Sequence, residues 1–138
     1  MPYIVLAAWI IQASVGTWLL IGWARHGRRH AGAIVPHVTV MVGTLVLWVA
    51  FLVTGVVAFA WATLVGFMIA IPFGETAMVR RSRRLRGITK PSAADYGGAI
   101  VDVFRGRMPP AVTFHAVFSA AVFFPCLGVC IGATVAAR

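Results

Sequence analysis

Residues 31–77 read AGAIVPHVTVMVGTLVLWVAFLVTGVVAFAWATLVGFMIAIPFGETA, and they carry a single charged side chain, Glu75. A helix needs about 20 apolar residues to cross the hydrocarbon core of a bilayer, so this run is too long for one span and suits two. The reversal is expected around Gly55, because glycine adopts the backbone conformations of a tight turn. The stretch therefore predicts two antiparallel membrane helices, at about 34–54 and 56–78.

Two further apolar runs flank this pair, at about 3–23 and 110–136. The first is followed by a basic segment and has none before it, which favours a retained helix over a cleaved signal peptide. Pro109 and Pro110 interrupt the chain before the last run, and proline is tolerated in the first turn of a helix. The sequence predicts an all-α integral membrane four-helix bundle that forms one domain over residues 1–138.

The composition excludes several classes of protein. Hydrophobic residues make up 61% of the chain and charged residues 11%, whereas soluble domains have about 25% charged residues. A soluble enzyme and a disordered tail are both excluded. The two cysteines are too few for a secreted disulfide scaffold.

The charges predict the orientation in the membrane. The chain has 12 Lys and Arg residues against three Asp and Glu residues, and most of the cations fall in two segments between the apolar runs. By the positive-inside rule both segments are cytoplasmic and both termini are outside. We expect a multi-pass protein of the inner (plasma) membrane whose basic segments contact anionic lipid headgroups rather than nucleic acid. These cations are Arg25, Arg28 and Arg29 in the first segment, and Arg80, Arg81, Arg83, Arg84, Arg86, Lys90, Arg105 and Arg107 in the second.

The second basic segment is expected to contain a short helix at about 92–106. Ser92 followed three residues later by Asp95 is a helix-start pattern, and apolar residues then recur on one helical face. We predict an amphipathic helix at the cytoplasmic membrane surface, although a helix packed under the bundle would give the same pattern. The third span is expected to continue through Arg86 and to end at Gly87. The apolar face consists of Tyr96, Ile100, Val103 and Phe104.

Two histidines are the main candidates for chemistry, because ionisable side chains are costly inside a membrane. His37 and His115 lie near the cytoplasmic starts of two parallel spans, and therefore at similar depth. If these helices face each other, the two imidazoles can ligate one haem iron from opposite sides. The alternative is that each histidine bonds to a backbone carbonyl or to a neighbouring helix. If the two histidines do ligate a haem, the side chains expected to line its pocket are Met41, Phe114 and Phe118.

Glu75 is the only glutamate, and it lies close to the expected headgroup depth. A lone intramembrane carboxylate is typical of a proton-coupled carrier, but this position favours a salt bridge to Arg80, Arg25 or a partner. A third interpretation is a hydrogen bond that orients His37 or His115.

The last span contains two patterns of small residues. Cys126 and Cys130 share one helical face, and their spacing favours packing over a redox role. Gly128 and Gly132 form a G-x-x-x-G match, which predicts close packing against another helix of this chain or of a partner.

The histidine contexts, Pro-His-Val at 36–38 and Thr-Phe-His-Ala at 113–116, carry a resemblance. The chain resembles small four-helix membrane cytochromes of the b type and the membrane anchors of respiratory dehydrogenases. The resemblance implies one haem b, ligated by His37 and His115, that serves electron transfer in or beside a respiratory complex. Family members with two haems carry a second histidine pair near the other face, and this sequence has none there.

Two other functions remain open at this stage. The chain can be an accessory or assembly subunit with no cofactor, acting through other membrane subunits or as a homo-oligomer. It can also be a small transporter, although its spans have few polar residues. No catalytic motif is present, so we do not expect an enzyme in its own right.

Overall fold

The computed structural model describes residues 1–138 and is entirely helical. The helices are α1 (Pro2–Arg25), α2 (Ala31–Thr54), α3 (Val57–Arg86), α4 (Ala94–Phe104) and α5 (Pro110–Ala136). All except α4 are long and apolar enough to cross a membrane. The all-α class and the four candidate membrane spans are thereby confirmed, and this helix content is that of a multi-pass membrane protein.

α5 occupies the expected range, and α3 continues through Arg86 and ends at Gly87 as predicted. The main difference is that α2 begins earlier than expected, at Ala31. Gly55 and Gly87 end α2 and α3 with φ angles of 71° and 66°. These are left-handed conformations that glycine adopts without steric cost, which explains why the two helices stop there.

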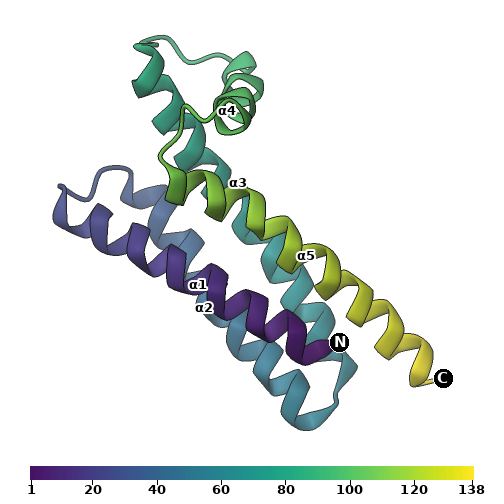
Figure 1. Ribbon diagram of the computed structural model, residues 1–138. Helices are drawn as coiled ribbons and strands as arrows, with labels where there is room; N and C mark the ends of the chain where they lie inside the picture. The colour runs from purple at the N-terminus through teal and green to yellow at the C-terminus, as the bar shows by residue number, and fades with distance from the viewer.

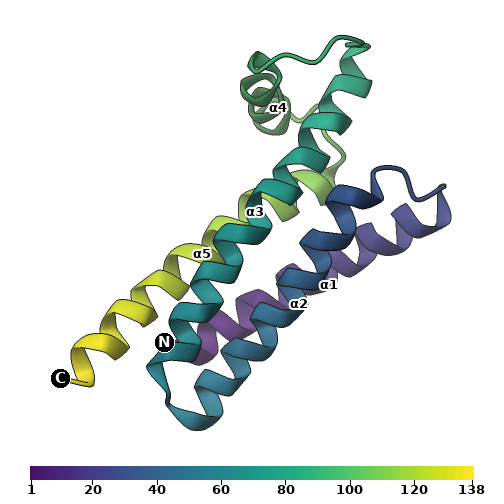
Figure 2. The same ribbon diagram turned by 180° about the vertical axis from the view of Figure 1, so that it is seen from behind.

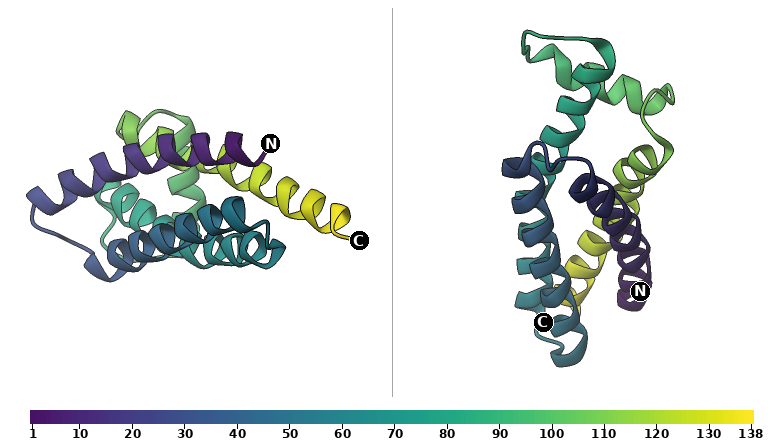
Figure 3. Two further views of the ribbon diagram at one scale, coloured as in Figure 1. Left: turned by 90° about the horizontal axis from the view of Figure 1, so that it is seen from below. Right: turned by 90° about the vertical axis from the view of Figure 1, so that its left-hand side faces the viewer.

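The four long helices form a bundle of two pairs. α2 packs along α3 over the most extensive interface, and α1 packs along α5, as the view from below in Figure 3 shows. α1 also contacts α2, and α3 contacts α5, whereas no backbone contact joins α2 to α5. The helices therefore follow the order α1, α2, α3, α5 around the bundle, with α2 and α5 diagonally opposed.

Both chain termini lie at one end of the bundle and the two basic segments lie at the other (Figures 1 and 2). α3 has 30 residues and is therefore about 45 Å long, more than the roughly 30 Å of a hydrocarbon core. Its last turns extend past the neighbouring helices, and α4 packs crosswise against them (Figure 1).

The hydrophobic core fills the half of the bundle near the termini. It contains ten buried residues from all four long helices, with Trp9, Trp48 and Phe67 as the largest side chains. Cys126 and Cys130 are fully buried in it, so they pack as small apolar side chains. The opposite half, towards the basic segments, contains the histidines.

Gly128 and Gly132 lie on the outer surface of α5. No atom of another helix lies within 4 Å of the position that a Cβ atom would take at either glycine. The G-x-x-x-G pattern therefore mediates no packing within this chain. The face of α5 that packs inside the bundle is the one with the two cysteines, because the aromatic core lies on that side.

Candidate functional site

His37 of α2 and His115 of α5 face each other across the bundle. Their ring centroids are 6.3 Å apart, and the ring planes cross at 74°. Each histidine lies roughly 7–9 Å along its helix from the basic end, because an α-helix rises about 1.5 Å per residue. Two side chains 78 positions apart in the sequence thus meet between diagonal helices.

The ring of His37 is held against α3. Its Nδ1 lies 3.0 Å from the carbonyl oxygen of Ala70. A carbonyl oxygen only accepts hydrogen bonds, so Nδ1 must carry the proton, and in a neutral imidazole this leaves the lone pair of Nε2 free. Metal-ligating histidines usually have this arrangement, with the other ring nitrogen bonded to a carbonyl.

The ring of His115 is placed by α1. Gln12, which is 4% exposed, donates from Nε2 to the backbone carbonyl oxygen of His115 at 2.7 Å. The Oε1 atom of Gln12 and the Nδ1 atom of His115 are both buried and have no hydrogen-bond partner. Buried polar atoms without hydrogen-bond partners are rare. Here one lies on Gln12 and the other on His115, the two residues that the bond to the carbonyl oxygen already joins.

A glycine lies against each imidazole. A Cβ atom at Gly74 of α3 would lie 2.9 Å from Cε1 of His37, and one at Gly16 of α1 would lie 3.0 Å from Cε1 of His115. Any larger side chain would therefore push the ring away from its present position. All four long helices contribute to the site: α2 and α5 supply the rings, and α1 and α3 supply the space for them.

The donor set suits a metal that brings its own equatorial ligands. Two imidazoles that share one metal ion through bonds of about 2 Å have ring centroids roughly 6 Å apart, close to the separation seen here. No group of three or more His, Cys, Asp or Glu side chains suited to a metal ion is present. Protein sites for zinc or copper need at least three such ligands, whereas haem iron needs only the axial pair. The two imidazoles therefore match a haem iron in the number of protein ligands and in their separation.

The predicted neighbours of the histidines lie in different places. Met41 and Phe118 pack against the hydrophobic core. Phe114 stacks on Phe118 at a centroid distance of 4.9 Å and lines an open groove of about 450 Å³ between α1 and α5. Within this chain Glu75 forms no salt bridge with Arg80 or Arg25 and no hydrogen bond with either histidine, while a salt bridge to a partner stays a prediction. Glu75 accepts a hydrogen bond of 2.7 Å from the hydroxyl group of Tyr96, because α4 folds back onto α3.

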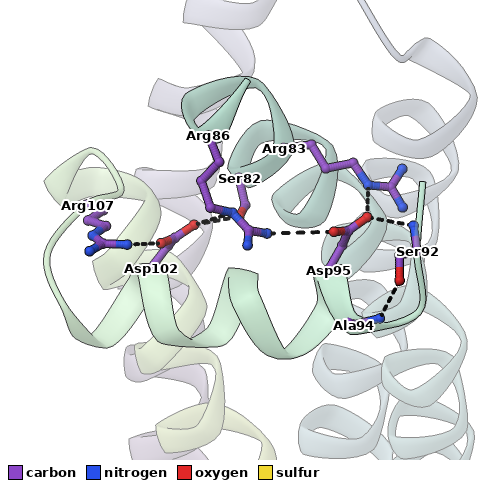
Figure 4. A network of polar contacts seen from close by, with 8 residues as sticks. All are labelled: Ser82, Arg83, Arg86, Ser92, Ala94, Asp95, Asp102 and Arg107. Atoms are coloured by element: carbon purple, nitrogen blue, oxygen red, sulfur yellow. Dashed lines mark hydrogen bonds and ion pairs between the residues drawn. The ribbon is translucent and has the colours of Figure 1, made fainter. Parts of the chain in front are cut away.

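A network of ions joins α4 to the end of α3 (Figure 4). Arg83 Nε donates to Asp95 Oδ2 at 2.6 Å, and Asp95 also accepts from the backbone N–H of Ser92 at 2.8 Å. The Oγ atom of Ser92 accepts from the N–H of Ala94 at 3.2 Å. The helix begins at Ala94 with Ala93 as its N-cap, so Ser92 is not the N-cap that the spacing predicts, although Asp95 does bond back to it.

Asp102 holds the other end of α4. It accepts a hydrogen bond of 2.6 Å from the hydroxyl group of Ser82 and forms ion pairs with Arg86 at 3.2 Å and Arg107 at 3.3 Å. Asp95 and Asp102 are both buried. The sequence places them on the polar face of an amphipathic helix, and that polar face is the one that packs on α3.

The apolar face of α4 is consequently left largely uncovered. Tyr96, Ile100 and Phe104 are exposed, and Phe104 has 75% of its surface accessible. Val103 differs from the other three, because it is 5% exposed and packs inward. The helix is amphipathic as predicted, but the face that packs on the rest of the protein carries both acids together with Ala99 and Val103.

The acids make the docking of α4 dependent on pH. The Ser92 N–H bond is the main cause that lowers the pKa of Asp95, and the Ser82 bond is the main cause that lowers the pKa of Asp102, in both cases against the effect of burial. Because docking lowers both pKa values, the charged acids stabilise the docked state at pH values above the ordinary carboxyl pKa of about 4. This stabilisation is lost as the pH falls through the lower pKa values of the docked state.

We therefore expect α4 to stay docked from pH 8 down to about pH 5 and to detach in the range below about pH 4. Hydrogen exchange of residues 94–104, corrected for intrinsic rates, measures this. The Asp95→Asn/Asp102→Asn variant should exchange rapidly across the whole range, because the ion pairs are absent at every pH. Equal protection in this variant at pH 7 would contradict the ionic origin of the docking.

No protein-family model matches the chain, and no curated protein or solved structure shows significant similarity to it.

Three residues of the site were not among the predicted ligands and neighbours. They are Gln12, Gly16 and Gly74. Gln12 is the only amide side chain in the whole sequence and lies within an apolar span, which is a signal that sequence reasoning can use. The two glycines give no such signal, because glycine is frequent in membrane helices.

Proposed function

We propose that this chain is a membrane protein that binds one haem b between His37 and His115 and serves electron transfer in or beside a respiratory complex. The observation that carries the proposal is the pair of imidazoles, 6.3 Å apart on diagonal helices, with no third protein ligand nearby. Haem b, when bound, takes up and releases single electrons.

The residues around the pair have defined roles in this proposal. The Ala70 carbonyl fixes the tautomer and orientation of His37, and Gln12 fixes the backbone that carries His115. Gly16 and Gly74 let the rings approach α1 and α3 closely. The apolar spans exclude water from the site, and a dry surrounding shell influences the reduction potential of a haem.

The proposed orientation places the basic end in the cytoplasm and both termini outside the inner (plasma) membrane. The charge asymmetry between the two ends supports it. Glu75 lies nearer the bundle than the last turn of α3, so its hydrogen bond to Tyr96 holds the start of α4 close to the bundle. This contact supports a position of α4 at the membrane surface. The face with Tyr96, Ile100 and Phe104 is then directed towards the membrane surface.

An absorption spectrum of the purified protein, oxidised and then reduced with dithionite, tests the haem proposal. We expect a Soret band that sharpens on reduction, with resolved α and β bands and one haem per chain. The protein must be expressed with haem available. A flat visible spectrum under these conditions would reject the proposal.

A second candidate function is an accessory subunit without a cofactor. Gly128 and Gly132 on the outer face of α5 favour it, because small residues allow the close approach of a helix from another subunit. This candidate predicts a flat spectrum together with co-purification of a larger complex in mild detergent. A stable monomer without a partner would contradict it.

A further inference from the structure

Four cationic or titratable side chains gather where the α1–α2 turn meets α3. Arg29 and His30 belong to the turn, and Arg80 and Arg84 belong to the last turns of α3. Arg80 Nη1 lies 3.5 Å from His30 Nδ1, which joins the two segments. We call these four residues the His30 cluster.

The charges of the three arginines act on the histidine ring. Burial is the main cause that lowers the pKa of His30, and the positive charges of Arg80, Arg84 and Arg29 lower it further. All three guanidinium groups are therefore near enough to His30 for their positive charges to act on the same ring. α2 also begins at this point, and the positive end of its helix dipole adds to the local potential.

The protein itself supplies no anion to this cluster. The sequence has only three acidic side chains. Asp95 and Asp102 form their ion pairs with other arginines, and Glu75 bonds to Tyr96. A group of like charges that has no counter-charge within the protein is free to bind an anion from outside.

We propose that the His30 cluster binds the phosphate group of an anionic phospholipid. The cluster lies at the ends of α1 and α2 that carry the basic turn, and in the proposed orientation this end of the bundle meets the lipid headgroups. Guanidinium groups hold phosphate oxygens through paired, charge-assisted hydrogen bonds, and Arg29, Arg80 and Arg84 are all exposed. Anionic lipids are abundant in the cytoplasmic leaflet, where the basic segments are proposed to lie. This inference does not depend on haem.

The test compares two variants that lose the same charge. Arg80→Gln/Arg84→Gln removes half of the cluster, whereas the control Lys90→Gln/Arg105→Gln removes two exposed cations that form no ion pair. Native mass spectrometry of the full chain in neutral detergent measures the binding of phosphatidylglycerol and of phosphatidylcholine. Inorganic phosphate is added as a competitor, and the haem content of each sample is recorded.

We expect phosphatidylglycerol binding to weaken by about 10- to 30-fold in Arg80→Gln/Arg84→Gln and by less than about 3-fold in the control, from roughly 1 kcal/mol per cation near an anionic lipid. Phosphatidylcholine binding should not change. An equal loss in both variants would overturn the proposal, because it would indicate only diffuse attraction. Displacement of the lipid by equimolar phosphate would identify a site for free phosphate instead. Loss of haem with lipid binding intact would identify a site for haem carboxylates and would also overturn the proposal.

Discussion

Replacing His37 or His115 with alanine should abolish the haem spectrum of the purified protein while leaving membrane insertion unchanged. The reason is that His37 and His115 are the only histidines within the spans, and their rings are brought together there. Loss of a supporting residue at a metal site typically costs 10- to 100-fold in affinity, and loss of a ligand should cost more. We expect haem content to fall more than about 100-fold in either variant.

The matched control for these variants is His26→Ala. His26 is exposed in the basic turn, and its Nδ1 contacts the backbone oxygen of Gly22, far from the pair. This variant should keep the full haem content. The double variant His37→Ala/His115→Ala should be no worse than either single variant, because one missing axial ligand already removes the site. Normal haem content in both single variants would reject the ligand assignment.

Much of the fold could be predicted because the physical signals are long and local. Each span is an uninterrupted apolar run of helix length, and the prolines and glycines that end the runs act through local backbone geometry. The packing of α4 was not predictable in the same way. Asp95 and Asp102 have the pattern of a solvent-facing surface, and their partners Ser82, Arg83 and Arg86 belong to another helix.

The candidate site was predictable only in part. Equal depth for His37 and His115 follows from counting residues from the basic ends of two parallel helices. The order of the helices around the bundle does not follow from hydropathy, and this order is what makes the two rings face each other. Glu75 shows the same limit, because its hydrogen bond depends on where α4 folds back.

Filling the space beside either ring should remove haem almost as effectively as removing the ring. In Gly74→Val, the new Cβ atom would lie 2.9 Å from Cε1 and 3.1 Å from Nδ1 of His37, which forces the imidazole away from the Ala70 carbonyl. Gly16→Val acts in the same way on His115. Ligands must be held within about 0.5 Å of a productive geometry, so we expect haem content to fall at least about 10-fold in each variant.

Gly128→Val separates this steric effect from a general effect of valine in a helix. Gly128 is exposed on α5 and has open space around it, so the same substitution meets no side chain there. Haem content, measured per folded protein, should stay normal in this control. The thermal stability of Gly74→Val, Gly16→Val and Gly128→Val is compared in the same experiment. If Gly74→Val binds haem normally while His37→Ala does not, His37 must reach the iron from a rotamer other than the one packed on α3. The contact with Ala70 would then belong to the haem-free state alone.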